Sequence, residues 1–159
     1  MKGLRQHIRR LLLNEGIQPD SGVTSLLRQL EQQTSASSIG TYGAKYLQRY
    51  GDCTVELTIS VEGPKDIWLD KIETFGSNRE TDPNCFRKGH ASKMLTLLTQ
   101  AADDHGITLE LIAAPEAWQL RQNPTLPDKD ELAKFYSRHG FLETSRNFAQ
   151  VYMKRTPKS

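Results

Sequence analysis

The chain has 159 residues, of which 36% are hydrophobic and 25% are charged, and its formal net charge is +2. These values predict one globular domain with a core of its own. The mild charge argues against nucleic acid as an obligatory partner but does not exclude nucleic-acid binding. No apolar run approaches the roughly 20 residues that span a bilayer, and the N-terminus lacks a signal-peptide core with a cleavage site. We therefore expect a cytoplasmic protein without a membrane span, and the sequence is compatible with a homodimer.

The N-terminal forty residues are predicted to be mainly helical. Met1–Glu15 has apolar residues on one helical face and arginines on the other. Such a basic helix can bind a membrane surface, a nucleic acid or a protein groove, but packing of its apolar face on the domain is the simpler interpretation. Thr24–Gln33 is predicted to form a second helix. We therefore divide a single compact unit into an N-terminal helical segment, 1–40, and a main domain, 41–159.

A hairpin is predicted after this segment. Small polar residues at Thr34–Gly43 indicate a flexible connection, which is also a candidate lid. Alternating residues at Cys53–Val61 predict a strand, and Gly63–Lys65 turns the chain into a second strand at Ile67–Phe75.

The two cysteines, Cys53 and Cys85, show neither metal-ligand spacing nor the pattern of a disulfide framework. We therefore expect two inert thiols in a reducing compartment. The sequence also lacks a cluster of cysteine and histidine residues, so no metal is expected.

A basic turn that contains a glycine runs into an amphipathic helix near the middle of the chain. Its residues are Arg87, Lys88, Gly89, His90, Ala91 and Ser92. Backbone N–H groups at a helix start lack intrahelical partners and the helix dipole is positive there, so the turn is a candidate phosphate site. Gly89 lets the backbone approach a ligand closely. The alternative is plain loop chemistry, because glycine also precedes helices that bind nothing.

The elements around this turn favour the phosphate site. The strand Ile67–Phe75 precedes the turn, and a second strand, Ile107–Ala113, follows the helix after Gly106. A strand, turn, helix and strand in this order make a right-handed crossover between parallel strands.

The C-terminal part is predicted to contain one more helix and two strands. A loop that contains proline, Asn123–Asp130, leads to a short helix in Glu131–Phe141, which Gly140 closes before a strand. Asn147–Met153 is the last predicted strand, and the residues after it are expected to fray.

Two of these motifs resemble the GCN5-related N-acetyltransferases. The acetyl-CoA site of that family has a Gln/Arg-x-x-Gly-x-Gly/Ala turn, which Gly89 and Ala91 match, and arginine is commonly found at the position of Arg87. A later helix of the family commonly ends in a tyrosine followed by Gly-Phe, as in Tyr136 and Gly140–Phe141. The likeness covers roughly residues 67–153, and the chain is also similar to small acetyltransferases of phage and bacterial genomes.

The chain departs from the family pattern in three places. Phe86 stands where the family usually has Gln or Arg, and Lys129 stands where an Asn is frequent. The link Gly76–Cys85 is longer than usual; it either shapes a substrate entrance or is a harmless insertion.

The resemblance implies an α/β fold with a mixed, mostly antiparallel central sheet flanked by helices. It implies direct transfer of acetyl from acetyl-CoA to a primary amine of a small molecule or peptide, with Tyr136 donating a proton to the leaving thiolate. The alternative for Tyr136 is an aromatic core residue next to Phe135. It also implies a bulge near Glu73, Thr74 and Phe75, whose backbone N–H binds the oxyanion. Pantetheine would then pair between that strand and Thr108–Ala113.

The general base is left open among carboxylates of the two central strands. Asp70 and Glu110 are the first choices and Glu73 and Glu116 the others, although each is equally interpretable as a solvent-facing carboxylate. Burial between strands would raise the pKa of the true base.

The histidines are expected to have no catalytic role. His90 is at a position that usually faces outward in the family, so we expect a surface side chain. His105 and His139 lie near helix ends, where a cationic imidazole suits the helix dipole.

Two other interpretations stay open. One is a catalytically silent binding protein of the same fold that acts through the basic helix Met1–Glu15; Phe86 and the missing Asn favour it. The other is an acetylating toxin or a nucleic-acid modifier, for which the basic N-terminal face is the only sign. The acceptor is open among polyamines, amino sugars, aminated nucleotides, peptide N-termini and lysine side chains.

Overall fold

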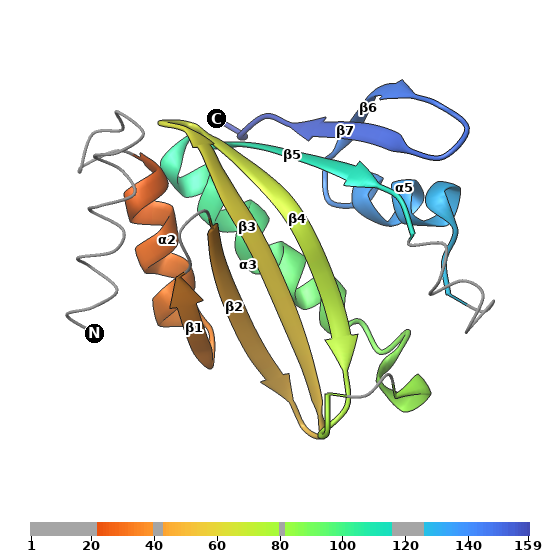
Figure 1. The fold of residues 1–159 in the computed structure, drawn as a ribbon. Helices are drawn as coiled ribbons and strands as arrows, with labels where there is room; N and C mark the ends of the chain where they lie inside the picture. Colours follow the sequence, from red (N-terminus) through yellow and green to blue (C-terminus); the bar gives the residue numbers. More distant parts are fainter. Residues whose placement is uncertain (1–21, 40–42, 80–81, 116–125) are drawn as a thin grey trace.

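The computed structural model describes residues 22–39, 43–79, 82–115 and 126–159 (Figure 1). The α-helices within these ranges are α2 (Gly22–Gln33), α3 (His90–His105) and α5 (Lys129–Ser137), and a short 3-10 helix, η1, spans Pro83–Cys85. The strands are β1 (Ala36–Ile39), β2 (Gly43–Tyr50), β3 (Cys53–Gly63), β4 (Asp66–Phe75), β5 (Thr108–Ala113), β6 (Leu142–Arg146) and β7 (Val151–Arg155). The predicted helix Met1–Glu15 lies outside the described residues.

The described strands form one open sheet in the order β1-β2-β3-β4-β5-β7-β6. Neighbouring strands are antiparallel except β4 and β5, which are parallel and are joined through α3. The predicted α/β fold with a mixed, mostly antiparallel sheet and flanking helices is therefore confirmed. The hairpin of β3 and β4 and the parallel crossover from β4 to β5 are also confirmed.

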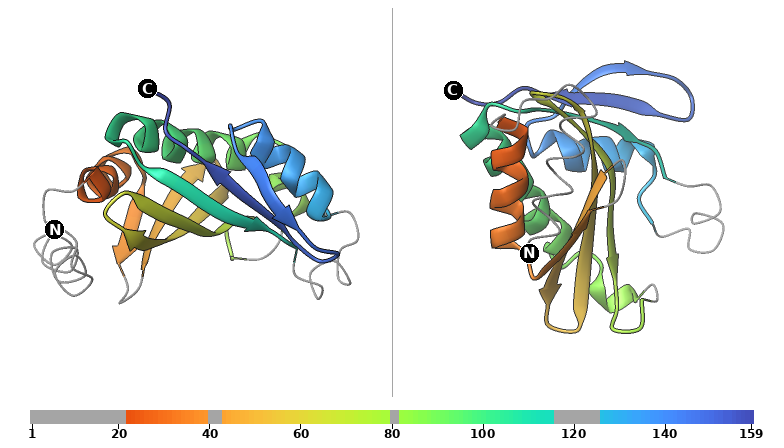
Figure 2. Two further views of the ribbon diagram at one scale, coloured as in Figure 1. Left: turned by 90° about the horizontal axis from the view of Figure 1, so that it is seen from above. Right: turned by 60° about the vertical axis from the view of Figure 1, so that its left-hand side comes forward.

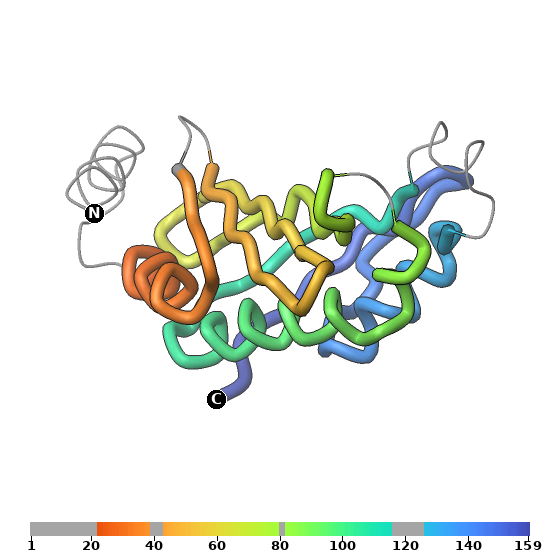
Figure 3. The backbone as a smooth tube through the Cα atoms, turned by 90° about the horizontal axis from the view of Figure 1, so that it is seen from below, coloured from red at the N-terminus to blue at the C-terminus, as the bar shows by residue number. Residues whose placement is uncertain are grey.

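The α-helices of the described ranges all lie along the same face of the sheet, as Figures 2 and 3 show from two directions. Leu26, Leu27 and Leu30 of α2 are buried in one core with the leucines of α3 and the inward-facing residues of the strands. The Tyr46 hydroxyl of β2 donates to the Leu27 carbonyl at 3.2 Å, so α2 is fastened to the sheet by a buried hydrogen bond. Residues 22–33 thus belong to the same core as the main domain.

Both ends of α3 follow the sequence pattern. Gly89 at the N-cap and Gly106 at the C-cap have positive φ angles of 80° and 67°, which glycine adopts without strain. The Gly106 N–H donates to the carbonyls of Ala102 and Asp103, which closes the helix. None of the described helices is long and apolar enough to cross a membrane.

Two segments differ from the sequence prediction. Thr34–Gly43 was expected to be a connection, but Ala36–Ile39 pairs with β2, and β2 itself has no counterpart among the predicted strands. The tail after Met153 was expected to fray, but β7 continues to Arg155, which is buried. The Lys158 N–H also donates to the Asp103 carboxylate at 2.8 Å. Tertiary partners order both segments, and such partners leave no local signal.

Candidate functional site

The parallel strands β4 and β5 pair over only part of their length. Their register runs from Asp66 opposite Thr108 to Leu69 opposite Leu111, and no registered pair follows within the described strands. Beyond these residues β4 continues to Phe75 and β5 to Ala113, and the two strands diverge (Figure 1). Toward the carboxyl ends of both strands, the facing edges of β4 and β5 are therefore no longer paired with each other.

A bulge lies where the ladder ends. On β3, Thr58 pairs with Lys71 and Ile59 pairs with Leu69, so Asp70 is an extra residue on β4. The sequence placed the bulge at Glu73–Phe75, and that position is wrong, because those residues pair regularly with β3. The oxyanion role of the β4 backbone stays a prediction, and Glu73, Thr74 and Phe75 stay on the diverging part of the strand.

The turn before α3 has a strained, open backbone. Arg87 and Gly89 have φ angles of 58° and 80°, both in the left-handed region. A Cβ at residue 89 would have no atom within 4 Å, so the backbone angle, and not crowding within the protein, accounts for this glycine. Arg87, Lys88 and Gly89 are exposed. The predicted turn is thus present, with two basic side chains at the surface.

The N-terminus of α3 has no side-chain cap and no acidic residue in its first turn. The first helical hydrogen bond runs from the Lys93 N–H to the Gly89 carbonyl at 3.0 Å. The N–H groups of His90, Ala91 and Ser92 come before that bond, so they have no intrahelical acceptor. These donors and the helix dipole give the α3 N-terminus the properties of an anion site.

The side chain of His90 is half-buried, whereas the sequence predicted a surface side chain. Its ring stacks on Tyr50 of β2, with centroids 4.8 Å apart and planes inclined by 7°. Its Nδ1 atom is buried and has no hydrogen-bond partner among the described residues. Lys93 adds a cation 5.5 Å from the centroid of the Tyr50 ring. The prediction of a surface histidine is therefore only partly right, because Tyr50 at the end of β2 covers one face of a half-buried ring.

A hydrogen bond joins the first turn of α3 to the end of α5. Ser92 Oγ and His139 Nε2 are 2.9 Å apart. Burial holds the pKa of His139 below its ordinary value, and the charges of Arg138 and Arg155 add to this effect. This lowered pKa works against the cationic imidazole that was expected at this helix end. The contact brings Ser92 close to the helix that carries Tyr136.

Tyr136 is 7% exposed and lies in the apolar core. Its ring contacts Phe135 and Phe141 edge-on, with centroid distances of 5.2 and 5.8 Å. Burial raises the pKa of Tyr136 to about 12, because the phenolate would be desolvated. No other described residue forms a hydrogen bond with its hydroxyl group. The phenol therefore keeps its proton at neutral pH.

The two preferred base candidates occupy different positions. Asp70 lies at the bulge, is exposed, and accepts a short hydrogen bond from Ser60 Oγ. Glu110 is half-buried and lies opposite Trp68 within the paired part of β4 and β5. Asp70 is therefore next to the diverging edges, but it lacks the burial that the sequence argument required of the base. Glu116 lies outside the described residues.

The sequence analysis missed a buried carboxylate on β3. Glu56 is 7% exposed and lies 3.7 Å from Lys45 Nζ and 3.8 Å from Arg79 Nη2. It is also the cross-strand partner of Glu73. The sequence showed that Glu56 lies between Val55 and Leu57 in an alternating strand. It did not show that Glu56, on the face of β3 opposite to these two residues, is also buried.

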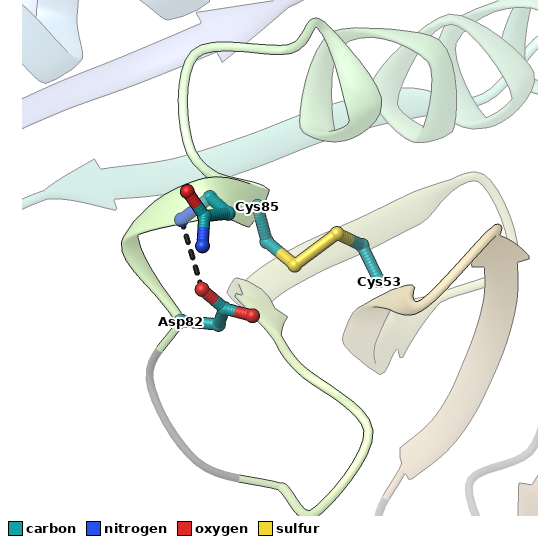
Figure 4. The surroundings of a disulfide bond; sticks show 4 residues. Cys53, Asp82 and Cys85 are labelled. Atoms are coloured by element: carbon teal, nitrogen blue, oxygen red, sulfur yellow. Dashed lines mark hydrogen bonds between the residues drawn. A yellow bond between two sulfur atoms is a disulfide. The ribbon is translucent and has the colours of Figure 1, made fainter.

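A disulfide that the sequence did not predict lies beside the turn. Cys53 and Cys85 are bonded, with Cα atoms 5.6 Å apart, and Figure 4 shows the bond between β3 and η1. The prediction of two inert thiols is wrong, and the argument for a reducing compartment that rested on it falls. Spacing alone gave no signal, since 32 residues separate the partners.

Comparison with protein-family models, with curated proteins and with solved structures finds no match for this chain. Within the described ranges, no group of three or more His, Cys, Asp or Glu side chains is arranged to hold a metal ion.

Proposed function

We propose that this chain is an N-acetyltransferase of the GCN5-related kind that transfers acetyl from acetyl-CoA to a primary amine. The observation that carries the proposal is the end of the β4–β5 ladder at Leu69 and Leu111, directly at the Asp70 bulge. Two parallel strands that separate leave main-chain N–H and C=O groups that an extended amide chain can pair with. Pantetheine is such a chain.

The α3 N-terminus supports the same assignment. β4 is followed along the chain by η1, the turn 86–89 and α3, and in the proposal a ligand lying along β4 has its far end near the uncapped N–H donors of α3. The exposed cations Arg87 and Lys88 add positive charge there. A diphosphate attached to pantetheine fits this order of donors, because helix N-termini and basic side chains both favour anions.

The proposed chemistry uses one acid and one base. A carboxylate takes a proton from the substrate ammonium, and the neutral amine attacks the thioester carbonyl. The C–N bond forms, the C–S bond breaks, and the Tyr136 phenol donates its proton to the departing thiolate. The phenol, with a pKa of about 12, is a weaker acid than a thiol, whose ordinary pKa is about 8.5, so this transfer runs uphill and is completed only when solvent returns a proton to the phenolate.

Backbone and carboxylate groups of β4 complete the proposed site. The main-chain N–H groups from the bulge to Glu73–Phe75 are the candidates for stabilising the oxyanion. Asp70 is the better-placed base, because it lies where the strands part, whereas Glu110 lies inside the ladder.

The test is release of free thiol from acetyl-CoA in the presence of a panel of primary amines. The panel contains a polyamine, an amino sugar, a peptide with a free N-terminus and a lysine peptide. We expect amine-dependent thiol release for at least one class, with an acetylated product of the matching mass. Coenzyme binding without turnover on any amine would instead favour the silent binding protein, whose basic helix Met1–Glu15 lies outside the described residues.

A further inference from the structure

The disulfide lies at the start of the turn that the proposed function assigns to coenzyme phosphate. Cys85 ends η1 and is followed at once by Phe86 and the turn, while Cys53 is the first residue of β3 (Figure 4). Both cysteines are buried, with exposed fractions of 2% for Cys85 and 9% for Cys53. The turn therefore begins at a covalent attachment to the sheet.

A second attachment holds the other end of the same turn. His90, the first residue of α3, stacks on Tyr50, which ends β2. Tyr50 and Cys53 flank the tight turn between β2 and β3, so one corner of the sheet holds residues 85 and 90. The left-handed backbone of Arg87 and Gly89 lies between these two attachments. Such an arrangement keeps a strained turn in a single conformation.

The rest of the preceding segment is held mainly by local contacts. The Asp82 carboxylate accepts from the Asn84 N–H at 2.9 Å, and the Phe86 N–H donates to the Pro83 carbonyl at 3.3 Å. These bonds shape η1 but do not fasten it to the sheet. Arg79 makes a longer contact, 3.8 Å from Glu56, and is itself well exposed. Arg79 also lies 5.5 Å from the centroid of the Phe75 ring at the end of β4, and the disulfide is the covalent link between η1 and β3.

We propose that the Cys53–Cys85 disulfide makes coenzyme binding sensitive to oxidation state. The inference rests on the proposed function, because it assigns regulation to that site. A dithiol reductant attacks one sulfur as a thiolate, the S–S bond breaks, and a mixed disulfide forms. The second thiol resolves it, leaving two protein thiols and the oxidised reductant. Two electrons and two protons are gained, and Cys85 loses its covalent link to β3.

Reduction weakens binding because the donors are no longer preorganised. With the bond intact, the turn is held before the ligand arrives, and binding does not have to order it. With the bond broken, residues 86–89 sample more conformations, and binding has to restrict them. We expect affinity for acetyl-CoA to fall about tenfold, since several residues must be reordered.

The experiment is calorimetric titration of acetyl-CoA into three forms of the full chain. These are the oxidised protein, the protein reduced with dithiothreitol and checked for two free thiols, and Cys53→Ser/Cys85→Ser. We expect the last two forms to bind about tenfold more weakly than the first. Dithiothreitol added to the double variant is the control and should change nothing. Circular dichroism checks that the variant is folded, and the reduced wild type gives the answer if it is not.

Hydrogen exchange separates this inference from the proposed function. Amides of residues 86–92 should exchange faster after reduction, with no coenzyme present, while those of β3 stay protected. Equal affinity in the oxidised and reduced forms overturns the redox inference and leaves the function standing. No binding by any form overturns the proposed function and with it the assigned regulation. Unchanged exchange after reduction overturns the role of the disulfide in holding the turn.

Discussion

Arg155 of β7 and Asp103 of α3 form a bidentate ion pair, with Arg155 Nη1 and Nη2 donating to the two carboxylate oxygens at 2.8 and 2.7 Å. Arg155 is 4% exposed, and its Nε also donates to the His139 carbonyl at 2.9 Å. The guanidinium therefore connects β7, α3 and the loop after α5. A Cβ at residue 140 would lie 3.1 Å from Arg155 Nε, so the arginine packs against Gly140.

Removing the acidic partner should be strongly destabilising. Asp103→Ala leaves a buried guanidinium without its counter-charge, so we expect unfolding free energy to fall by about 3–5 kcal/mol. The matched control is Asp104→Ala, the next residue, whose exposed carboxylate bonds Gln29 at 3.0 Å and whose loss should cost about 0.5 kcal/mol or less. Urea unfolding measures both, and equal losses would contradict the account.

The same pair gives an acid dependence of stability. The hydrogen bonds from Arg155 hold the pKa of Asp103 below its ordinary value of 3.8, and the bond from the Lys158 N–H adds to this. A carboxyl whose pKa is lowered on folding stabilises the protein at pH values above its ordinary pKa. This contribution is lost as the pH falls through the folded-state pKa. Below pH 4, the free energy of unfolding, measured by urea unfolding, should therefore fall more steeply with falling pH for the wild type than for Asp103→Asn.

His139 should make stability fall at a higher pH. Its pKa is held below the ordinary value of 6.5 by burial and by Arg138 and Arg155. As pH falls from 7 toward 5, the unfolded chain takes up the proton first, so the folded state loses stability. His139→Gln should lose less stability over that range, measured by urea unfolding at matched pH values. Parallel curves for the two proteins would mean that His139 does not titrate differently on folding.

Tyr136→Phe should separate catalysis from binding. It removes the proposed proton donor and keeps the ring against Phe135 and Phe141, so we expect kcat to fall at least about a hundredfold. Acetyl-CoA affinity should stay unchanged. Tyr152→Phe is the control. It removes a hydroxyl of β7 that donates to Gln150 Oε1 at 3.1 Å and has no proposed role in catalysis. An unchanged kcat in Tyr136→Phe would exclude the residue as the acid.

The base is identified by comparing Asp70→Asn with Glu110→Gln. If Asp70 accepts the proton, its variant loses the rise of kcat/KM with pH, while Glu110→Gln keeps that rise. The opposite pattern in the two variants would assign the base to Glu110.

Local sequence patterns predicted the helices and strands in which buried residues recur at a regular spacing. Leucine spacing predicted α2 and α3, and alternation predicted β3, because each period reports the face that the element turns to the core. β1 could not be found in this way, since Ala36–Ile39 is short and polar and becomes a strand only by pairing with β2. Lys129 was placed in a loop, although the Asp128 side chain caps the Glu131 N–H and starts α5 there.

The candidate site was predicted only in its local parts. The turn at Gly89 and the short helix that carries Tyr136 followed from short motifs. The Asp70 bulge, the His90 stack and the Cys53–Cys85 bond depend on segments far apart in the sequence, so spacing gave no indication of them. The buried Arg155 was missed because arginine near a chain end is ordinarily exposed.

The most direct test of the account is calorimetric titration of the full chain with acetyl-CoA and with CoA. We predict that the wild type binds both and that Gly89→Glu weakens binding at least about tenfold, because a carboxylate enters the anion site. Gly106→Glu is the matched control, since Gly106 also has a positive φ and open space at Cβ but lies at the other end of α3. Binding of Gly89→Glu at wild-type affinity, or no binding by the wild type, would contradict the proposed coenzyme site.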